Sequence, residues 1–106
     1  MVMFMYYFVA ITLREAKRMT ALRETYEKQL VNLPKGSLRV KERNARKYFY
    51  LTYRRDGKVV SEYVGNDEST IADLKEQLER RKGVESLLKS IKKELVLMNK
   101  VLEATI

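Results

Sequence analysis

The dipeptide Asp56-Gly57 constrains the fold of this chain more than any other feature of its 106 residues. Aspartate followed by glycine, between two stretches rich in β-branched and aromatic residues, is a strong signal for a two-residue hairpin turn of type I′. Such a turn fixes which residues of the two strands lie opposite each other and which side chains share a face. The sequence therefore predicts a hairpin in which residues 47–54 pair with residues 58–64.

A third strand is expected before this hairpin. Residues 37–43 alternate between the apolar Leu38 and Val40 and the cations Arg39, Lys41 and Arg43, a pattern typical of a half-buried strand. Asn44-Ala45 is a candidate for the tight turn that follows. Residues 37–65 are therefore predicted to form a three-stranded antiparallel meander.

The Asp56-Gly57 turn also predicts the register of the hairpin. Arg55 should lie opposite Lys58, and on the same face we expect the pairs Tyr53–Val60, Leu51–Glu62 and Phe49–Val64. This face is mostly apolar, and together with Leu38 and Val40 it should pack on a helix. The other face should be open to solvent, with the pairs Arg54–Val59, Thr52–Ser61 and Tyr50–Tyr63. We call it the tyrosine face; its expected members are Tyr48, Tyr50, Thr52, Arg54, Ser61 and Tyr63, bordered by Arg39, Lys41 and Arg43.

The positive charge of the chain is concentrated in the same region. The whole chain has a net charge of +8, and residues 35–58, with nine basic and two acidic side chains, account for +7. Basic residues interleaved with aromatic rings are typical of a surface that binds nucleic acid, because the cations neutralise phosphates and the rings stack on bases. The expected binding residues are Arg39, Lys41, Arg43, Arg46, Lys47, Tyr48, Tyr50, Arg54, Arg55, Lys58 and Tyr63. The alternative is a solvated face that is basic for solubility and carries tyrosines for their β-propensity.

Helices are expected on both sides of the meander. Residues 12–33 carry apolar side chains three or four positions apart, at Leu13, Ala16, Met19, Leu22, Tyr26, Leu30 and Leu33, and Pro34 and Gly36 should end this helix. Thr12 and Glu15 are a candidate capping box at its start. The eleven apolar residues at positions 1–11 are also compatible with an extension of the helix to about residue 1.

The C-terminal region, residues 67–105, has a helical pattern as well, with Asp67, Ser69 and Thr70 as candidate N-caps. The phase of its apolar residues changes near Gly83, where the helix should kink or break into two. After that point Leu88, Ile91, Leu95, Met98 and Leu102 form a heptad-like seam. This seam could pair with a second subunit or with residues 13–33 of the same chain. The basic cluster Arg80-Arg81-Lys82 is either a further phosphate-binding surface or a solvated helix face.

Composition excludes several classes of site. The chain has no cysteine and no histidine, so disulfides, thiolate zinc sites and Ser-His-Asp triads are impossible. We expect no enzyme activity, no metal, no cofactor and no small-molecule substrate. The apolar residues 1–11 are too short to span a bilayer, which needs about 20, and no basic segment precedes them as in a secretory signal. They are expected in the core or a dimer interface of a cytoplasmic protein, a membrane-surface anchor being the alternative.

Residues 33–102 resemble a small meander-plus-coiled-coil module that is widespread on phages and mobile elements of Firmicutes. The resemblance is carried by Leu33-Pro-Lys-Gly-Ser-Leu38, Tyr48-Phe-Tyr-Leu-x-Tyr-Arg54, Asp56-Gly-Lys-Val-x-Ser-x-Tyr-Val-Gly65 and the Lys/Glu-rich heptad helix that follows. Such modules occur alone or ahead of Fic-type and nucleotidyltransferase domains. Because they are widespread on phages and mobile elements, the resemblance implies a mobile-element origin.

The meander and its following helix are also similar to the arm-site DNA-binding domain of tyrosine recombinases, in which the sheet enters the major groove. This similarity implies that Arg39, Lys41, Tyr48, Tyr50 and Arg54 face DNA. The present chain departs from that domain in having long helices on both sides of the sheet and no catalytic domain.

Taken together, these patterns predict a single α+β domain: a long N-terminal helix, a three-stranded antiparallel β-meander, and a long C-terminal helix or helix pair that forms an antiparallel coiled coil, with a homodimer expected. The expected function is non-catalytic binding of DNA or RNA through the tyrosine face. One alternative is an inhibitor that docks on a host-defence nucleoprotein, as anti-CRISPR proteins do, or competes for its nucleic acid. The other alternative is a coiled-coil adaptor.

Overall fold

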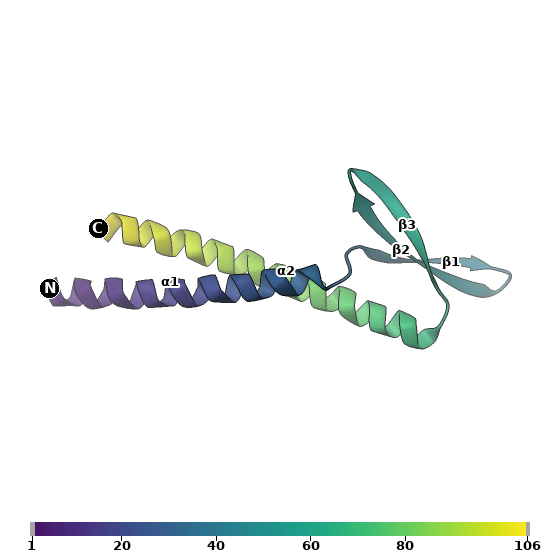
Figure 1. Cartoon of the computed structure of the whole chain (residues 1–106), viewed down its shortest axis with the longest axis horizontal. Helices are drawn as coiled ribbons and strands as arrows, with labels where there is room; N and C mark the ends of the chain where they lie inside the picture. The colour runs from purple at the N-terminus through teal and green to yellow at the C-terminus, as the bar shows by residue number, and fades with distance from the viewer. Residues whose placement is uncertain (1, 106) are drawn as a thin grey trace. The chain divides into compact units, whose positions relative to one another are not determined.

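The computed structural model describes residues 2–105, which form two long helices and a three-stranded sheet (Figure 1). The elements follow the chain as α1 (Val2–Val31), β1 (Ser37–Arg43), β2 (Arg46–Arg55), β3 (Lys58–Gly65) and α2 (Glu68–Thr105). This is the predicted α+β architecture. Met1, in the expected N-terminal helix, and Ile106, at the end of the expected domain, lie outside the described residues.

Two compact units share helix α2. One unit, Asn32–Gly83, contains the sheet and the first half of α2. The other contains α1 and the second half of α2 from Val84 onwards. Each unit has its own set of buried side chains, and each is described separately below.

The sheet is an antiparallel meander in the order β1-β2-β3. Both of its turns have two residues with positive φ: 51° and 64° at Asn44 and Ala45, and 51° and 78° at Asp56 and Gly57. Positive φ at both central positions is the geometry of a type I′ turn, whose twist matches that of the flanking strands. The predicted turns are therefore both present.

The predicted register holds along most of the hairpin and fails at its open end. Six of the expected pairs are observed, namely Arg55–Lys58, Tyr53–Val60, Leu51–Glu62, Arg54–Val59, Thr52–Ser61 and Tyr50–Tyr63. The expected pair Phe49–Val64 is wrong, because Phe49 lies opposite Gly65 and a bulge separates it from Tyr50. One extra residue, Val64, is accommodated on β3, and Gly65 adopts a φ of 110° that favours glycine.

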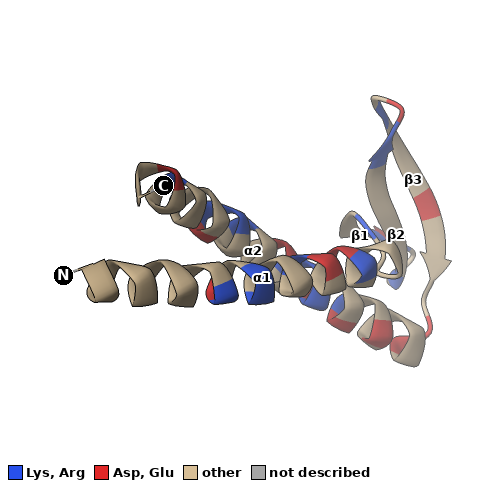
Figure 2. Ribbon diagram, turned by 60° about the vertical axis from the view of Figure 1, so that its left-hand side comes forward, with Lys and Arg blue, Asp and Glu red and all other residues tan. Residues whose placement is uncertain are grey.

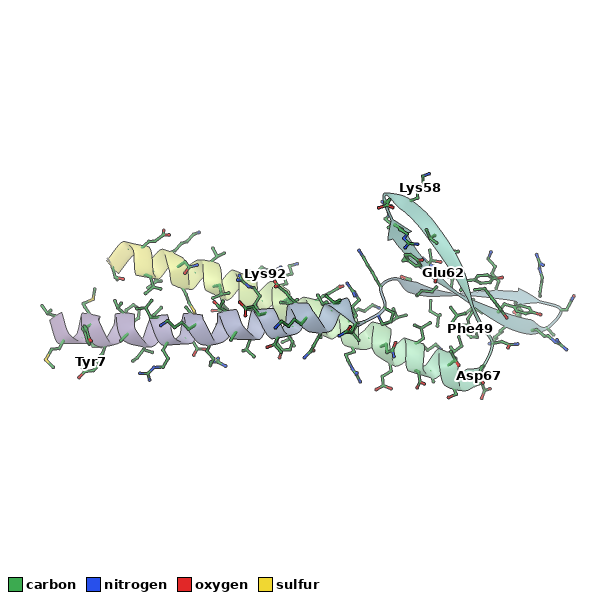
Figure 3. All side chains as sticks on the ribbon, viewed as in Figure 1. Tyr7, Phe49, Lys58, Glu62, Asp67 and Lys92 are labelled. Atoms are coloured by element: carbon green, nitrogen blue, oxygen red, sulfur yellow. The ribbon has the colours of Figure 1, made fainter. Side chains whose placement is uncertain are left out.

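The apolar face of the sheet packs on the first half of α2, as predicted, except that Val40, expected in this contact, is 53% exposed. Ile71 and Leu78 of α2 are buried, and Leu38, Val40 and Phe49 of the sheet line a groove together with Leu78. Lys75 Nζ lies 5.8 Å from the centre of the Phe49 ring, within the range of a cation–π contact. Figure 3 shows Phe49 between the sheet and the first turns of α2.

The start of β1 depends on a close approach between backbones. Gly36 has a φ of 126°, and a Cβ at this position would lie 2.4 Å from the carbonyl oxygen of Thr52. Only glycine fits here, because it lacks that atom and tolerates the positive φ. Gly36 thus holds the connection from α1 against strand β2.

Helix α2 begins at an N-cap and continues without interruption to Thr105. The Asp67 carboxylate accepts hydrogen bonds from the Thr70 hydroxyl at 2.8 Å and the Thr70 backbone N–H at 3.2 Å. These bonds select Asp67 among the three candidate caps and hold the pKa of its carboxyl below the usual 3.8. The helix passes through Gly83, so the expected alternative of two separate helices is wrong.

In the second unit, α1 lies antiparallel to the second half of α2 (Figure 1). The predicted seam of α2 faces α1: Leu88, Ile91, Leu95 and Leu102 are buried and Met98 is half-buried. Val84, one turn before the seam, is buried as well. Lys92 Nζ of α2 and Glu27 Oε1 of α1 lie 4.0 Å apart, which is consistent with the helices running side by side. The seam therefore packs within the chain.

The N-terminal half of α1 departs from the sequence-based expectations in two places. Thr12 is not an N-cap, because it lies inside α1 and donates its hydroxyl to the Phe8 carbonyl at 2.8 Å. Leu13, expected on the packed stripe, is exposed, whereas Ala16, Met19, Leu22, Tyr26, Leu30 and Leu33 are all half-buried. Among residues 2–105, neither helix is apolar enough over a sufficient length to cross a membrane.

Candidate nucleic-acid interface

Three tyrosine rings form a cluster on the sheet face that points away from the first half of α2. The ring centres of Tyr50 and Tyr63, which are directly paired across β2 and β3, lie 5.4 Å apart. The rings of Tyr48 and Tyr63 lie 6.3 Å apart along the diagonal. Tyr63 is 57% exposed, while Tyr48 and Tyr50 are half-buried by their neighbours. The cluster is a mutually packed aromatic surface that leaves most of one ring open to a ligand.

Cations from β1 and β2 surround this cluster. Lys41 Nζ lies 4.9 Å from the centre of the Tyr50 ring, a cation–π distance. Arg39 of β1 lies opposite Tyr50 of β2. Arg43 and Arg46 lie opposite each other on either side of the Asn44-Ala45 turn. A groove of about 470 Å³ opens here, lined by Lys41, Glu42, Arg43, Tyr48 and Tyr50. This groove combines positive charge with aromatic rings.

The carboxylates of the strands are confined to positions of one face, whereas the cations lie on both. Their two carboxylates, Glu42 and Glu62, both lie at positions that share the apolar face, since Glu42 pairs with Lys47 and Glu62 with Leu51. Glu62 accepts a hydrogen bond from the Tyr53 hydroxyl on that face, which raises the pKa of Tyr53 above 10. Glu42 also lines the groove beside Lys41 and Tyr48. Five cations share the tyrosine face: Arg39, Lys41, Arg43, Arg46 and Arg54.

Three predicted binding residues are not brought to the tyrosine face. Lys47, Arg55 and Lys58 alternate with its members and lie on the opposite side of the sheet. Figure 2 shows the basic residues of the sheet in blue, and Lys58 is marked at the hairpin end in Figure 3. The predicted list therefore combined residues of two faces.

The Arg80-Arg81-Lys82 cluster is engaged within its own unit. Arg80 pairs with Glu76 at 3.3 Å and Lys82 with Glu79 at 3.5 Å. Arg81 Nη1 donates to the Leu33 carbonyl at 2.8 Å. These contacts favour a structural role for Arg81 and a solvated helix face for its neighbours.

The register of β1 adds two members to the tyrosine face that had not been assigned to it. The two-residue turn at Asn44-Ala45 places Arg46 opposite Arg43, so Arg46, which had no assigned face, belongs to this one. Ser37 lies opposite Thr52 and was missed. Counting backwards from the Asn44-Ala45 turn would have found it. Thr52 Oγ1 and Ser61 Oγ, 3.1 Å apart, complete the polar part of the face.

Comparison with known proteins supports a relationship over the part of the chain that carries this surface. Residues 12–76 match the model of a family described as a domain of unknown function, DUF6788. The chain belongs to the DUF6788 family. The DUF6788 match includes the whole sheet, and hence all of the tyrosine face, and it ends before the seam of α2. No curated protein and no solved structure matches the chain.

Proposed function

We propose that this protein is a non-catalytic nucleic-acid-binding protein that uses the tyrosine face as its contact surface. The supporting observation is the distribution of charge across the sheet: five cations share a face with three tyrosines, whereas both strand carboxylates and three further cations occupy positions of the opposite face. A face that is basic only for solubility gives no reason why both carboxylates lie at positions of the other face.

The chemistry of the face suits a phosphate backbone with accessible bases. Guanidinium groups bind phosphate oxygens in a bidentate manner, and their contacts with the backbone supply affinity that does not depend on sequence. The exposed ring of Tyr63 offers a stacking surface for an unpaired base. The Thr52 and Ser61 hydroxyls can donate to phosphate oxygens.

Charge reversal on the tyrosine face tests this function. We expect Lys41→Glu combined with Arg54→Glu to weaken binding of a fluorescein-labelled oligonucleotide by at least about tenfold, because two phosphate contacts become repulsive. Fluorescence anisotropy would measure the affinity, and circular dichroism would check that the fold is retained. The matched control is Lys93→Glu with Lys100→Glu, which changes the net charge equally at two exposed positions of α2.

The result that supports the function is a loss of affinity in the Lys41/Arg54 variant and near-normal affinity in the control. An equal loss in both variants would mean that net charge alone drives binding. Absence of binding by the unmodified protein to single strands and duplexes, even at low salt, would refute the function.

Single strands and duplexes can be distinguished at Tyr63. If a base stacks on its ring, Tyr63→Ala should reduce single-strand affinity by about 1–3 kcal/mol. Tyr63→Phe should retain most of it, because the aromatic ring remains. A duplex, whose bases are already stacked, should respond less to the loss of the ring.

A further inference from the structure

We propose that the N-terminal turns of α1 form the contact surface between two copies of this chain. The first thirteen residues contain no charged side chain, and the first charge along the chain is Arg14. Figure 2 shows these turns of α1 without any blue or red residue. Such a stretch within an exposed helix is unusual in a chain of which 34% is charged.

The structure leaves residues 2–8 of this segment exposed. Every residue from Val2 to Phe8 is exposed, and the half-buried residues that mark the contact with α2 begin only at Val9 and Ala10. Figure 3 shows side chains, including Tyr7, projecting from this end of α1. A helix that is apolar around its whole circumference is normally buried. Most of the apolar surface of residues 2–8 therefore has no packing partner within the chain.

The exposed area is large enough for a specific interface. The rings of Phe4, Tyr6, Tyr7 and Phe8 are 73, 72, 58 and 42% exposed. An aromatic side chain offers about 150–250 Å², so these four expose roughly 400–600 Å² in each chain. This area is as large as the largest apolar patch of a typical monomer, about 300–600 Å². Complete burial of the four rings in two copies would remove up to about 800–1,200 Å² from water, a range that includes the threshold of about 1,000 Å² for a specific interface.

A second copy of the chain suits this surface because the surface is uncharged. In a two-fold dimer the same patch meets itself, which is unfavourable for a charged patch and favourable for a neutral apolar one. The C-terminal half of α2, in the same unit, exposes further apolar residues that a second copy can cover: Val96, Leu97 and Val101.

A membrane surface suits the segment less well. Helices that lie in a bilayer interface have one apolar face and one polar face rich in Lys and Arg, which attracts anionic lipids. The first thirteen residues have neither a polar face nor a basic residue. Dimerisation through this surface does not depend on nucleic-acid binding by the tyrosine face.

The test is the mass of the full chain in solution, measured by light scattering after size exclusion over a series of concentrations. We expect a plateau at twice the chain mass of 12.5 kDa. Phe4→Glu combined with Ile11→Glu should shift the mass to that of one chain, since both residues are exposed and their loss should not unfold the monomer. The matched control is Val31→Glu with Leu87→Glu, an equal exchange of exposed apolar residues outside this segment, which should remain dimeric.

Four outcomes would overturn the proposal. The first is a mass of one chain at every concentration, and the second is a dimer that persists in the Phe4/Ile11 variant. The third is a mass that increases without a plateau, which indicates aggregation. The fourth is a monomer that floats with phosphatidylcholine–phosphatidylglycerol vesicles and loses this binding in the Phe4/Ile11 variant, because the segment would then serve a membrane surface.

Discussion

The salt dependence of nucleic-acid binding follows from the number of cations on the tyrosine face. Each phosphate neutralised on a duplex contributes about −0.9 to the slope of log K against log salt concentration, and about −0.7 on a single strand. The face carries five cations, Arg39, Lys41, Arg43, Arg46 and Arg54. If each meets one phosphate, the slope per bound chain is about −4.5 on a duplex. Affinity then falls about 500-fold between 50 and 200 mM salt.

Neutral substitutions turn this slope into a test of the face. Lys41→Gln with Arg54→Gln leaves three cations, so the slope should fall to about −2.7 and the loss over the same salt range to about 40-fold. Lys47→Gln with Lys58→Gln removes the same charge from the opposite face of the same sheet. That control should retain a slope of about −4.5.

Anisotropy titrations of a labelled duplex at several salt concentrations would give the three slopes. Equal slopes in the two double variants would refute the reasoning, because the cations of the two faces would then contribute alike. A slope near zero in the unmodified protein would refute it too, since binding would not involve phosphates.

Three further predictions concern stability, each measured by urea or thermal unfolding. Gly36→Ala should destabilise by about 1–3 kcal/mol, since it adds strain at a positive φ and a backbone clash, whereas Gly83→Ala, in a helix interior with open space around the new Cβ, should stabilise by about 0.5–1 kcal/mol. The folded state lowers the pKa of the Asp67 carboxyl, so the ionised cap stabilises the fold fully above the unfolded pKa of 3.8, and this stabilisation is lost as pH falls through the lower folded pKa. Asp67→Asn should remove this acid-dependent part of the stability, because asparagine caps the helix without a titrating group. Leu95→Ala, at a buried position, should cost about 2–5 kcal/mol, whereas Leu87→Ala, at a half-exposed one, should change stability by no more than about 0.5 kcal/mol.

The sheet could be predicted in detail because its turns are short and its side chains alternate strictly. A two-residue turn permits one register, so Asp56-Gly57 was sufficient to pair Tyr50 with Tyr63 across β2 and β3. The failure came at Phe49, where a bulge shifts the pairing to Gly65. A regular alternation of side chains gives no signal for an extra residue in one strand. The one sequence feature at the bulge is Gly65, since glycine tolerates the φ of 110° found there.

The bulge does not disturb the candidate site because of where it lies. Every pair that defines the tyrosine face is between the bulge and the Asp56-Gly57 turn or belongs to the β1–β2 ladder. Beyond Tyr50 the register of β3 changes as the chain leaves the sheet for Asp67 and α2. A single misplaced pair at the exit of the sheet therefore left the assignment of the two faces correct.

The extents of the helices could be predicted from the sequence, but the element that packs against the seam of α2 could not. A heptad-like seam such as Leu88–Leu102 satisfies a second subunit and an intramolecular helix equally, so its spacing cannot choose between them. In the structure α1 covers the seam, which removes it from the surfaces open to a second copy. Residues 2–8 are apolar and exposed instead, but they have no amphipathic stripe and so give no sequence signal for the face that a partner contacts. We therefore assign the expected dimer contact to the N-terminal turns of α1, where exposure, neutral charge and area favour a second copy.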